Sequence, residues 1–109
     1  MAEELHHFST IERARNAAIK WLENQQVSFG PHRKIEIGRL GVMTGQEVGV
    51  SASQDPFWRI RLDYDPAKLA HFNVECGKGT SRQKAAFCFP GSEQLMEKLA
   101  RARNPRRRF

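Results

Sequence analysis

The sequence predicts a small α+β domain. We expect an N-terminal amphipathic helix packed on a twisted, mainly antiparallel sheet of about four strands, then a short C-terminal helix and a basic tail. Three observations predict this fold: helical spacing of apolar residues near the N-terminus, strict alternation in two central segments, and a length of 109 residues, which suits one domain. We therefore expect a single domain over residues 1–109, with its core over about 9–100 and the tail at 101–109.

The first predicted element is a helix that begins near Ser9. Residues 9–12 are Ser-Thr-Ile-Glu, the pattern of a capping box with Ser9 as the cap. Apolar side chains then recur every three or four positions, with charged ones between them. The apolar set is Ile11, Ala14, Ala17, Ala18, Trp21 and Leu22. We expect the helix to end near residues 24–26, and we assign no role to His6 and His7 before it.

Alternation of apolar and polar residues predicts the central strands. Residues 58–64 place Trp58 and Leu62 on one side and charged residues on the other. Residues 71–76 alternate in the same way after a turn at Asp65-Pro66, which predicts an antiparallel partner strand.

The remaining elements give weaker patterns. Residues 84–89 alternate less sharply and predict a third strand of the same design. Glycines separate the β-favouring pieces at 35–37 and 48–50, which we expect to be short strands or an ordered loop. Leu95, Met96 and Leu99 indicate a short C-terminal helix capped by Ser92.

The polar side of the predicted strands gathers chemically useful side chains. They are Arg59, Arg61, Asp63, His71, Asn73, Glu75 and Lys84. One interpretation is a network of cross-strand ion pairs, each contributing about 0.2–1 kcal/mol. The other is a site for an anionic ligand, most specifically a phosphodiester.

RNA cleavage without a metal needs a base, an acid and a cation that holds the developing phosphorane charge. We assign His71 as general acid or base, Arg61 and Lys84 as phosphate and transition-state stabilisers, and Asp63 as the group that orients or charges the histidine. Glu75 lies four residues beyond His71, about 13 Å at roughly 3.3 Å per residue, which is too far to share one phosphorus atom.

Further candidates contact the substrate. Asn73 and Arg59 would touch the nucleotide, and Lys78 and Arg82 lie in a basic connector suited to the RNA backbone. His32 stands beside two basic residues; it is either the second proton-transfer group or a surface residue of a turn.

Charge and cysteine content exclude several classes of protein. The net charge of +6 comes mostly from the five arginines in residues 101–109, which form either a solvated terminus or an arm that neutralises phosphates.

Cys76 and Cys88 are too few for a disulfide scaffold, and they point to opposite faces by alternation. No zinc spacing occurs, so we expect no metal and no cofactor, and we expect neither a membrane span nor a signal peptide.

Four elements follow one another along the chain. They are the helical segment 14–22 with Trp21-Leu22, then Gly45-Gln46-Glu47-Val48-Gly49, Arg61-Leu62-Asp63-Tyr64-Asp65 and Ala70-His71-Phe72-Asn73-Val74. In this order they resemble the C-terminal toxin domains of bacterial polymorphic toxins, which end rearrangement-hotspot and contact-dependent growth-inhibition proteins. The sequence departs from that pattern after Gly77, where Lys84 stands in a region that often carries a further histidine.

The resemblance implies a fold shared by barnase-like and RelE-like ribonucleases, an RNA substrate and a dedicated immunity protein, which we expect to be acidic where it contacts the domain. The resemblance implies that the residues matching the motifs are functionally important, namely Arg61, Asp63, Asp65, His71 and Asn73. It also implies delivery by a secretion system as part of a larger protein, with action in the cytoplasm of a target bacterium. Fold analogy alone does not establish a reaction.

The sequence therefore predicts a toxin domain that is a metal-independent endoribonuclease, a hydrolase that cuts RNA by attack of the 2′-OH. The alternatives are a non-catalytic nucleic-acid-binding module, a toxin nuclease that acts on DNA, and an interaction or immunity-type protein that docks through the polar sheet face.

Overall fold

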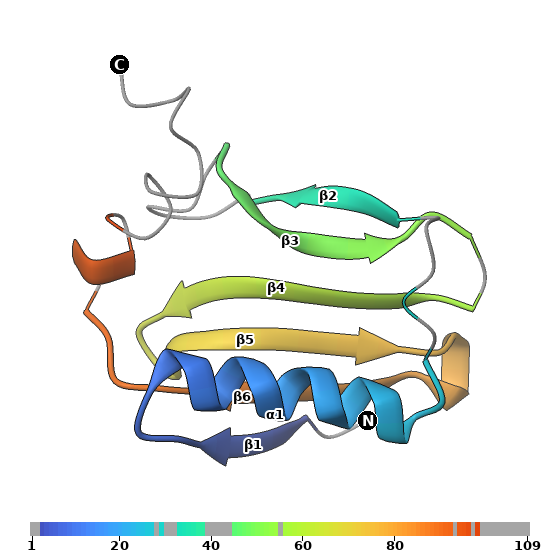
Figure 1. The fold of residues 1–109 in the computed structure, drawn as a ribbon, viewed down its shortest axis with the longest axis horizontal. Coiled ribbons are helices and arrows are strands. Elements are labelled where there is room, and N and C mark those ends of the chain that lie inside the picture. Colours follow the sequence, from blue (N-terminus) through green and yellow to red (C-terminus); the bar gives the residue numbers. More distant parts are fainter. Residues whose placement is uncertain are drawn as a thin grey trace.

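The computed structural model describes residues 3–27, 29, 33–38, 45–54, 56–92, 94–96 and 98. In them, a 14-residue helix packs on one side of a six-stranded sheet (Figure 1). The elements are β1 (Glu4–His7), α1 (Ile11–Asn24), β2 (Arg33–Ile37), β3 (Glu47–Ala52), β4 (Trp58–Asp65), β5 (Leu69–Cys76), the 3-10 turn η2 (Gly79–Ser81) and β6 (Gln83–Cys88).

The strands lie in the order β1-β6-β5-β4-β3-β2. All neighbours are antiparallel except β1 and β6, which are parallel. The α+β class and the mainly antiparallel sheet are thus confirmed, whereas the expected number of about four strands is too low. The difference comes from the edge strand β1, which the sequence pattern did not reveal, and from the pieces at 35–37 and 48–50, which both form strands, β2 and β3.

The N-terminal edge strand β1 was not predicted. It brings His6 and His7 into the sheet, where the His6 ring stacks on Phe87 with 5.0 Å between ring centroids. The two histidines therefore pair with β6 rather than forming a free terminus.

The helix begins and ends on specific backbone contacts. Its N-cap is Thr10 rather than Ser9, and the Thr10 hydroxyl accepts a hydrogen bond from the Arg13 N–H at 3.2 Å. At the other end Gln26 has φ 63° and Val27 N–H donates to the Leu22 carbonyl, the pattern of a Schellman motif. The predicted end near residues 24–26 is confirmed.

The predicted alternation is confirmed in β4, β5 and β6. Leu62, Phe72 and Phe87 lie in register and are buried on the side that α1 covers, together with Ala14 and Leu22 of the helix. We call this side the helix face and the opposite side the polar face. The residues of the polar face on these strands are Arg59, Arg61, Asp63, Asp65, Leu69, His71, Asn73, Glu75, Lys84, Ala86 and Cys88.

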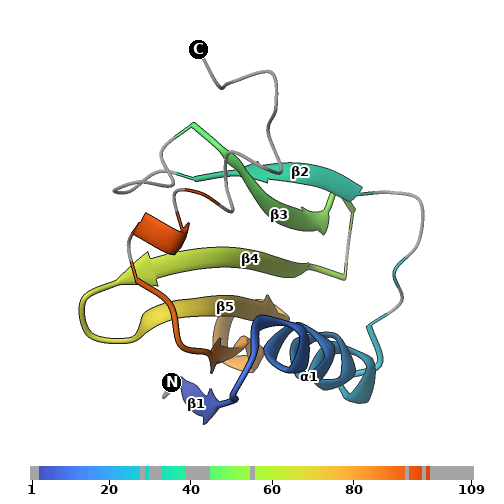
Figure 2. The same ribbon diagram turned by 60° about the vertical axis from the view of Figure 1, so that its left-hand side comes forward.

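One helix covers only part of the sheet. Six strands at about 4.8 Å spacing span roughly 24 Å, whereas a helix with its side chains is about 10 Å wide. The helix contacts β5 and β6, and the views in Figures 1 and 2 show β2 and β3 extending beyond it. On the helix face of β2, Ile35 and Ile37 accordingly remain 54% and 43% exposed.

The chain after β6 closes one end of the core. Residues 94–96 and 98 have helical backbone, and the Ser92 hydroxyl accepts a hydrogen bond from the Leu95 N–H at 3.2 Å, as expected for the cap. Met96 is fully buried. The tail at 101–109 lies outside the described residues. In the described part of the chain, no helix has the length and apolar character needed to cross a membrane.

The packing of α1 yields a stability prediction. Replacing the fully buried Leu22 by alanine leaves a cavity beneath the helix and should lower the free energy of unfolding by about 2–5 kcal/mol, measured by urea denaturation. The matched control is Ile35→Ala on the uncovered part of the helix face, where we expect a loss below about 1 kcal/mol because that side chain is half exposed. Equal losses in the two variants would contradict the assigned core.

Candidate anion-binding site on the polar face

Cross-strand pairing brings six of the predicted site residues onto one surface. Arg59 lies opposite Glu75, which lies opposite Lys84 on the next strand. Arg61 is opposite Asn73, and Asp63 is opposite His71. The site candidates Arg59, Arg61, Asp63, His71, Asn73 and Lys84 therefore share the polar face across β4, β5 and β6.

A cavity of about 380 Å³ opens on this surface. Its lining residues are Glu3, Arg59, Arg61, Lys68, Asn73, Glu75 and Lys84. Four cationic side chains against two carboxylates leave the lining with a net charge of +2. A polar cavity with excess positive charge favours an anionic ligand over a neutral one.

Ion pairs hold the cations of the cavity in place. Glu75 is almost buried and pairs with both Arg59 and Lys84, the latter at 3.3 Å between Oε1 and Nζ. Arg59 also lies 3.7 Å from Glu36 of β2. The Nε atoms of Arg59 and Arg61 are buried and have no hydrogen-bond partner in the described part of the chain. The ion-pair network therefore leaves guanidinium donors unused.

The predicted contact between Asp63 and His71 does not form. The Asp63 Oδ2 accepts a hydrogen bond from Asn73 Nδ2 at 3.1 Å and lies 3.7 Å from Arg61 Nη2. Asn73 on the neighbouring strand and Arg61 on the same strand therefore hold the carboxylate away from the histidine. Asp63 orients the amide of Asn73 and the guanidinium of Arg61 instead.

The acid beside His71 is Asp65, at the end of β4. The Asp65 Oδ2 lies 3.8 Å from His71 Nε2, and the His71 side chain is fully buried. The other ring nitrogen, Nδ1, lies 2.7 Å from the Leu69 carbonyl. A carbonyl oxygen only accepts, so Nδ1 carries the proton, and in the neutral ring Nε2 is the nitrogen that can accept a second proton.

The turn between β4 and β5 builds this arrangement. Asp65 Oδ1 accepts hydrogen bonds from the backbone N–H groups of Ala67 and Lys68, at 2.9 and 2.7 Å. Leu69 has φ 61°, a left-handed conformation that is unfavourable for a leucine. This conformation occurs at the residue whose carbonyl accepts the hydrogen bond from His71 Nδ1–H.

Lys68 connects the turn to the N-terminal segment. Its Nζ lies 2.7 Å from the Glu3 carboxylate and 4.0 Å from Asp65. The hydrogen bond to Glu3 raises the pKa of Lys68, which is therefore cationic at neutral pH. A carboxylate of the chain itself thus occupies part of the cavity.

Three residues that line the cavity, Glu3, Lys68 and Glu75, were not predicted from the sequence to be site residues. Glu75 was placed on the correct face, but it was set aside because of its distance from His71. Its opposition to Arg59 and Lys84 across neighbouring strands is the signal that could have identified it. Lys68 lies in the predicted turn, and Glu3 precedes a strand that the pattern did not reveal, so no local signal marked either of them.

Four described candidates lie outside the lining, namely Asp63 and His71 on the polar face and Lys78 and Arg82 in the connector. Arg82 follows η2, and its guanidinium carbon is 5.7 Å from the centre of the Phe57 ring. Lys78 precedes η2 and is exposed. His32 is outside the described residues. The structure therefore does not bring the basic connector into the cavity.

The two cysteines lie on opposite faces, as predicted. Cys76 belongs to the helix face and Cys88 to the polar face; both are buried free thiols. Burial raises the pKa of both thiols, which disfavours the reactive thiolate form. Among the described residues, no three His, Cys, Asp or Glu side chains gather as metal ligands.

The chain matches no protein-family model and no curated protein sequence. Any functional conclusion therefore depends on the geometry of the polar face.

Proposed function

We propose that this chain is an endoribonuclease toxin domain that binds RNA across the polar face and cuts it by attack of the 2′-OH. The observation that carries the proposal is the cavity lined by four cations and two carboxylates on one side of the sheet. A phosphodiester is an anion of suitable size, and guanidinium groups bind its oxygens through paired N–H donors.

The proposed roles follow from the neighbours of each side chain. Arg59, Arg61 and Lys84 bind the phosphate and stabilise the charge that develops on it in the transition state. Asn73, held by Asp63, contacts the nucleotide. His71 accepts the 2′-OH proton at Nε2 as the 2′-oxygen attacks phosphorus, and Asp65 stabilises the imidazolium that forms. The bond from phosphorus to the 5′-oxygen breaks, and the leaving 5′-oxygen takes a proton from solvent.

Access to His71 requires a local rearrangement in this proposal. The His71 ring has no exposed surface. Its partner Asp65 also lies near Lys68, and Lys68 forms an ion pair with Glu3. A bound phosphate would compete with the Glu3 carboxylate for Lys68. Release of Glu3 is thus the step that we expect to open the cavity toward the histidine.

The second candidate function is RNA binding without cleavage. The complete burial of His71 favours it, because a buried imidazole does not exchange protons with a bound nucleotide. The polar face would then act through its cations alone. If the chain is a toxin domain, its partner is an immunity protein that is acidic at the contact surface, because the four cations that line the cavity outnumber its two carboxylates.

The function is tested by incubating the purified protein with total cellular RNA in EDTA. We expect defined fragments ending in a cyclic phosphate, and no cutting of single-stranded DNA of the same sequence. Arg61→Gln should slow cleavage about a hundredfold because it removes a donor to the transition state. The matched control is Arg13→Gln on the exposed side of α1, which should cut like the wild type.

His71→Ala should abolish cutting while the protein remains folded by circular dichroism. Intact RNA with the wild-type protein would overturn the nuclease assignment, as would cutting that survives both His71→Ala and Arg61→Gln. Binding of RNA by the wild type without any cutting would establish the second candidate.

The Glu3 carboxylate gives an independent prediction. Glu3→Gln removes a negative charge from the cavity and frees Lys68, so the affinity for an RNA oligonucleotide should rise several-fold at low salt. Glu4→Gln is the control, since Glu4 is exposed and pairs with His6 outside the cavity. Fluorescence anisotropy measures both affinities. Equal affinity of the two variants would show that RNA binds away from Lys68.

A further inference from the structure

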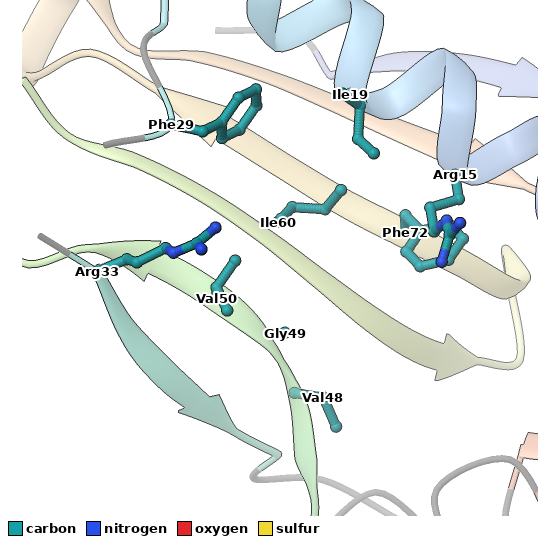
Figure 3. A pocket seen from close by; sticks show the side chains of 9 residues that line it. All are labelled: Arg15, Ile19, Phe29, Arg33, Val48, Gly49, Val50, Ile60 and Phe72. Carbon is teal, nitrogen blue, oxygen red and sulfur yellow. The ribbon is translucent and has the colours of Figure 1, made fainter. Parts of the chain in front are cut away.

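A second cavity, of about 280 Å³, lies on the opposite side of the sheet. Its floor is apolar and is formed by Val48 and Val50 of β3, Ile60 of β4 and Phe72 of β5 (Figure 3). Ile19 of α1 contributes to one wall. The cavity is thus distinct from the polar face in both position and chemistry.

The cavity exists because α1 does not reach across the sheet. Phe29 forms another wall and packs edge-on against the Trp58 ring, with 5.0 Å between ring centroids. Between Phe29 and the helix, Val50 and Ile60 are only partly buried. This uncovered apolar floor continues toward β2, where Ile35 and Ile37 are exposed on the same face.

Two arginines border this apolar floor. Arg15 projects from α1 and Arg33 from the start of β2. In the view of Figure 3 the two arginines stand at opposite ends of the cavity, with the Arg33 guanidinium group near Val50 and that of Arg15 near Phe72. Within the described part of the chain, neither arginine forms an ion pair or hydrogen bond through its side chain. Two cations beside an apolar surface are complementary to a ligand with an apolar body and an anionic end.

We infer that this cavity binds a small amphipathic organic anion of the medium-chain carboxylate class. The hydrocarbon part lies on Val50 and Ile60, between Phe29 and Ile19. The carboxylate accepts hydrogen bonds from a guanidinium group of Arg15 or Arg33. The volume is slightly below the usual range of ligand pockets, about 300–1,000 Å³, which favours a small ligand over a drug-sized one. The inference does not depend on the proposed nuclease function.

The test uses decanoate as the probe, below its micelle concentration, with titration calorimetry and backbone amide shifts as readouts. We expect saturable binding at one site, with the largest shifts at Val50 and Ile60. Decyltrimethylammonium has the same chain with the opposite charge and should bind at least about tenfold more weakly, because it lacks the charge-assisted hydrogen bond.

Variants locate the site and its charge. The double variant Arg15→Gln with Arg33→Gln should weaken decanoate binding about tenfold or more, and Arg13→Gln on the same helix should leave it unchanged. Val50→Phe fills the cavity and should abolish binding, while thermal unfolding confirms that the variant is folded. Absent binding, equal binding of both probes, or binding unaffected by the double variant would each overturn the inference. Sedimentation showing that a second copy of the chain covers this face would also overturn it.

Discussion

The packing of α1 against β5 and β6 is the interaction on which the rest of the molecule depends. Ala14, Ala18 and Leu22 are fully buried in this contact, and two of them are alanines that let the helix lie close to the sheet. Because side chains alternate along a strand, this single contact decides the side of every residue in the central strands. His71 reaches the polar face because its neighbours Ala70 and Phe72 are buried on the helix face of β5, and the antiparallel register places Arg59 and Arg61 of β4 on the same side as His71.

A single helix on six strands leaves two surfaces of different character. On the polar face, paired charges replace a second layer: Arg59 and Lys84 flank Glu75, and Asp63 holds Asn73. Such pairs contribute modestly to stability, and the four cations that line the cavity against two carboxylates make this part of the surface suitable for an anion. On the helix face, the cover ends before β2 and leaves an apolar cavity between two arginines.

Sequence reasoning succeeded where a side chain's position follows from its own strand. The alternation of Trp58 with Arg59, and of Phe72 with His71, predicted both faces of β4 and β5. The sequence did not predict side-chain contacts that depend on residues far away in the chain. The partner of His71 is Asp65 rather than the directly opposed Asp63, because turn geometry and the Asn73 amide set the directions of the two carboxylates. Glu3 reaches Lys68 only because β1 joins the sheet beside β6, and no local pattern predicts that pairing.

The claim that the polar face binds RNA is tested most directly by mapping the contact at atomic resolution. The measurement is a nuclear magnetic resonance titration with a 2′-O-methyl RNA oligonucleotide, which lacks the attacking hydroxyl and therefore stays intact. The account predicts that the largest shifts occur at the Nε–H groups of Arg59 and Arg61 and the Nδ2 amide of Asn73, and that added salt reverses them. Shifts confined to the η2 segment or to the exposed side of α1, with these three side chains unchanged, would contradict it.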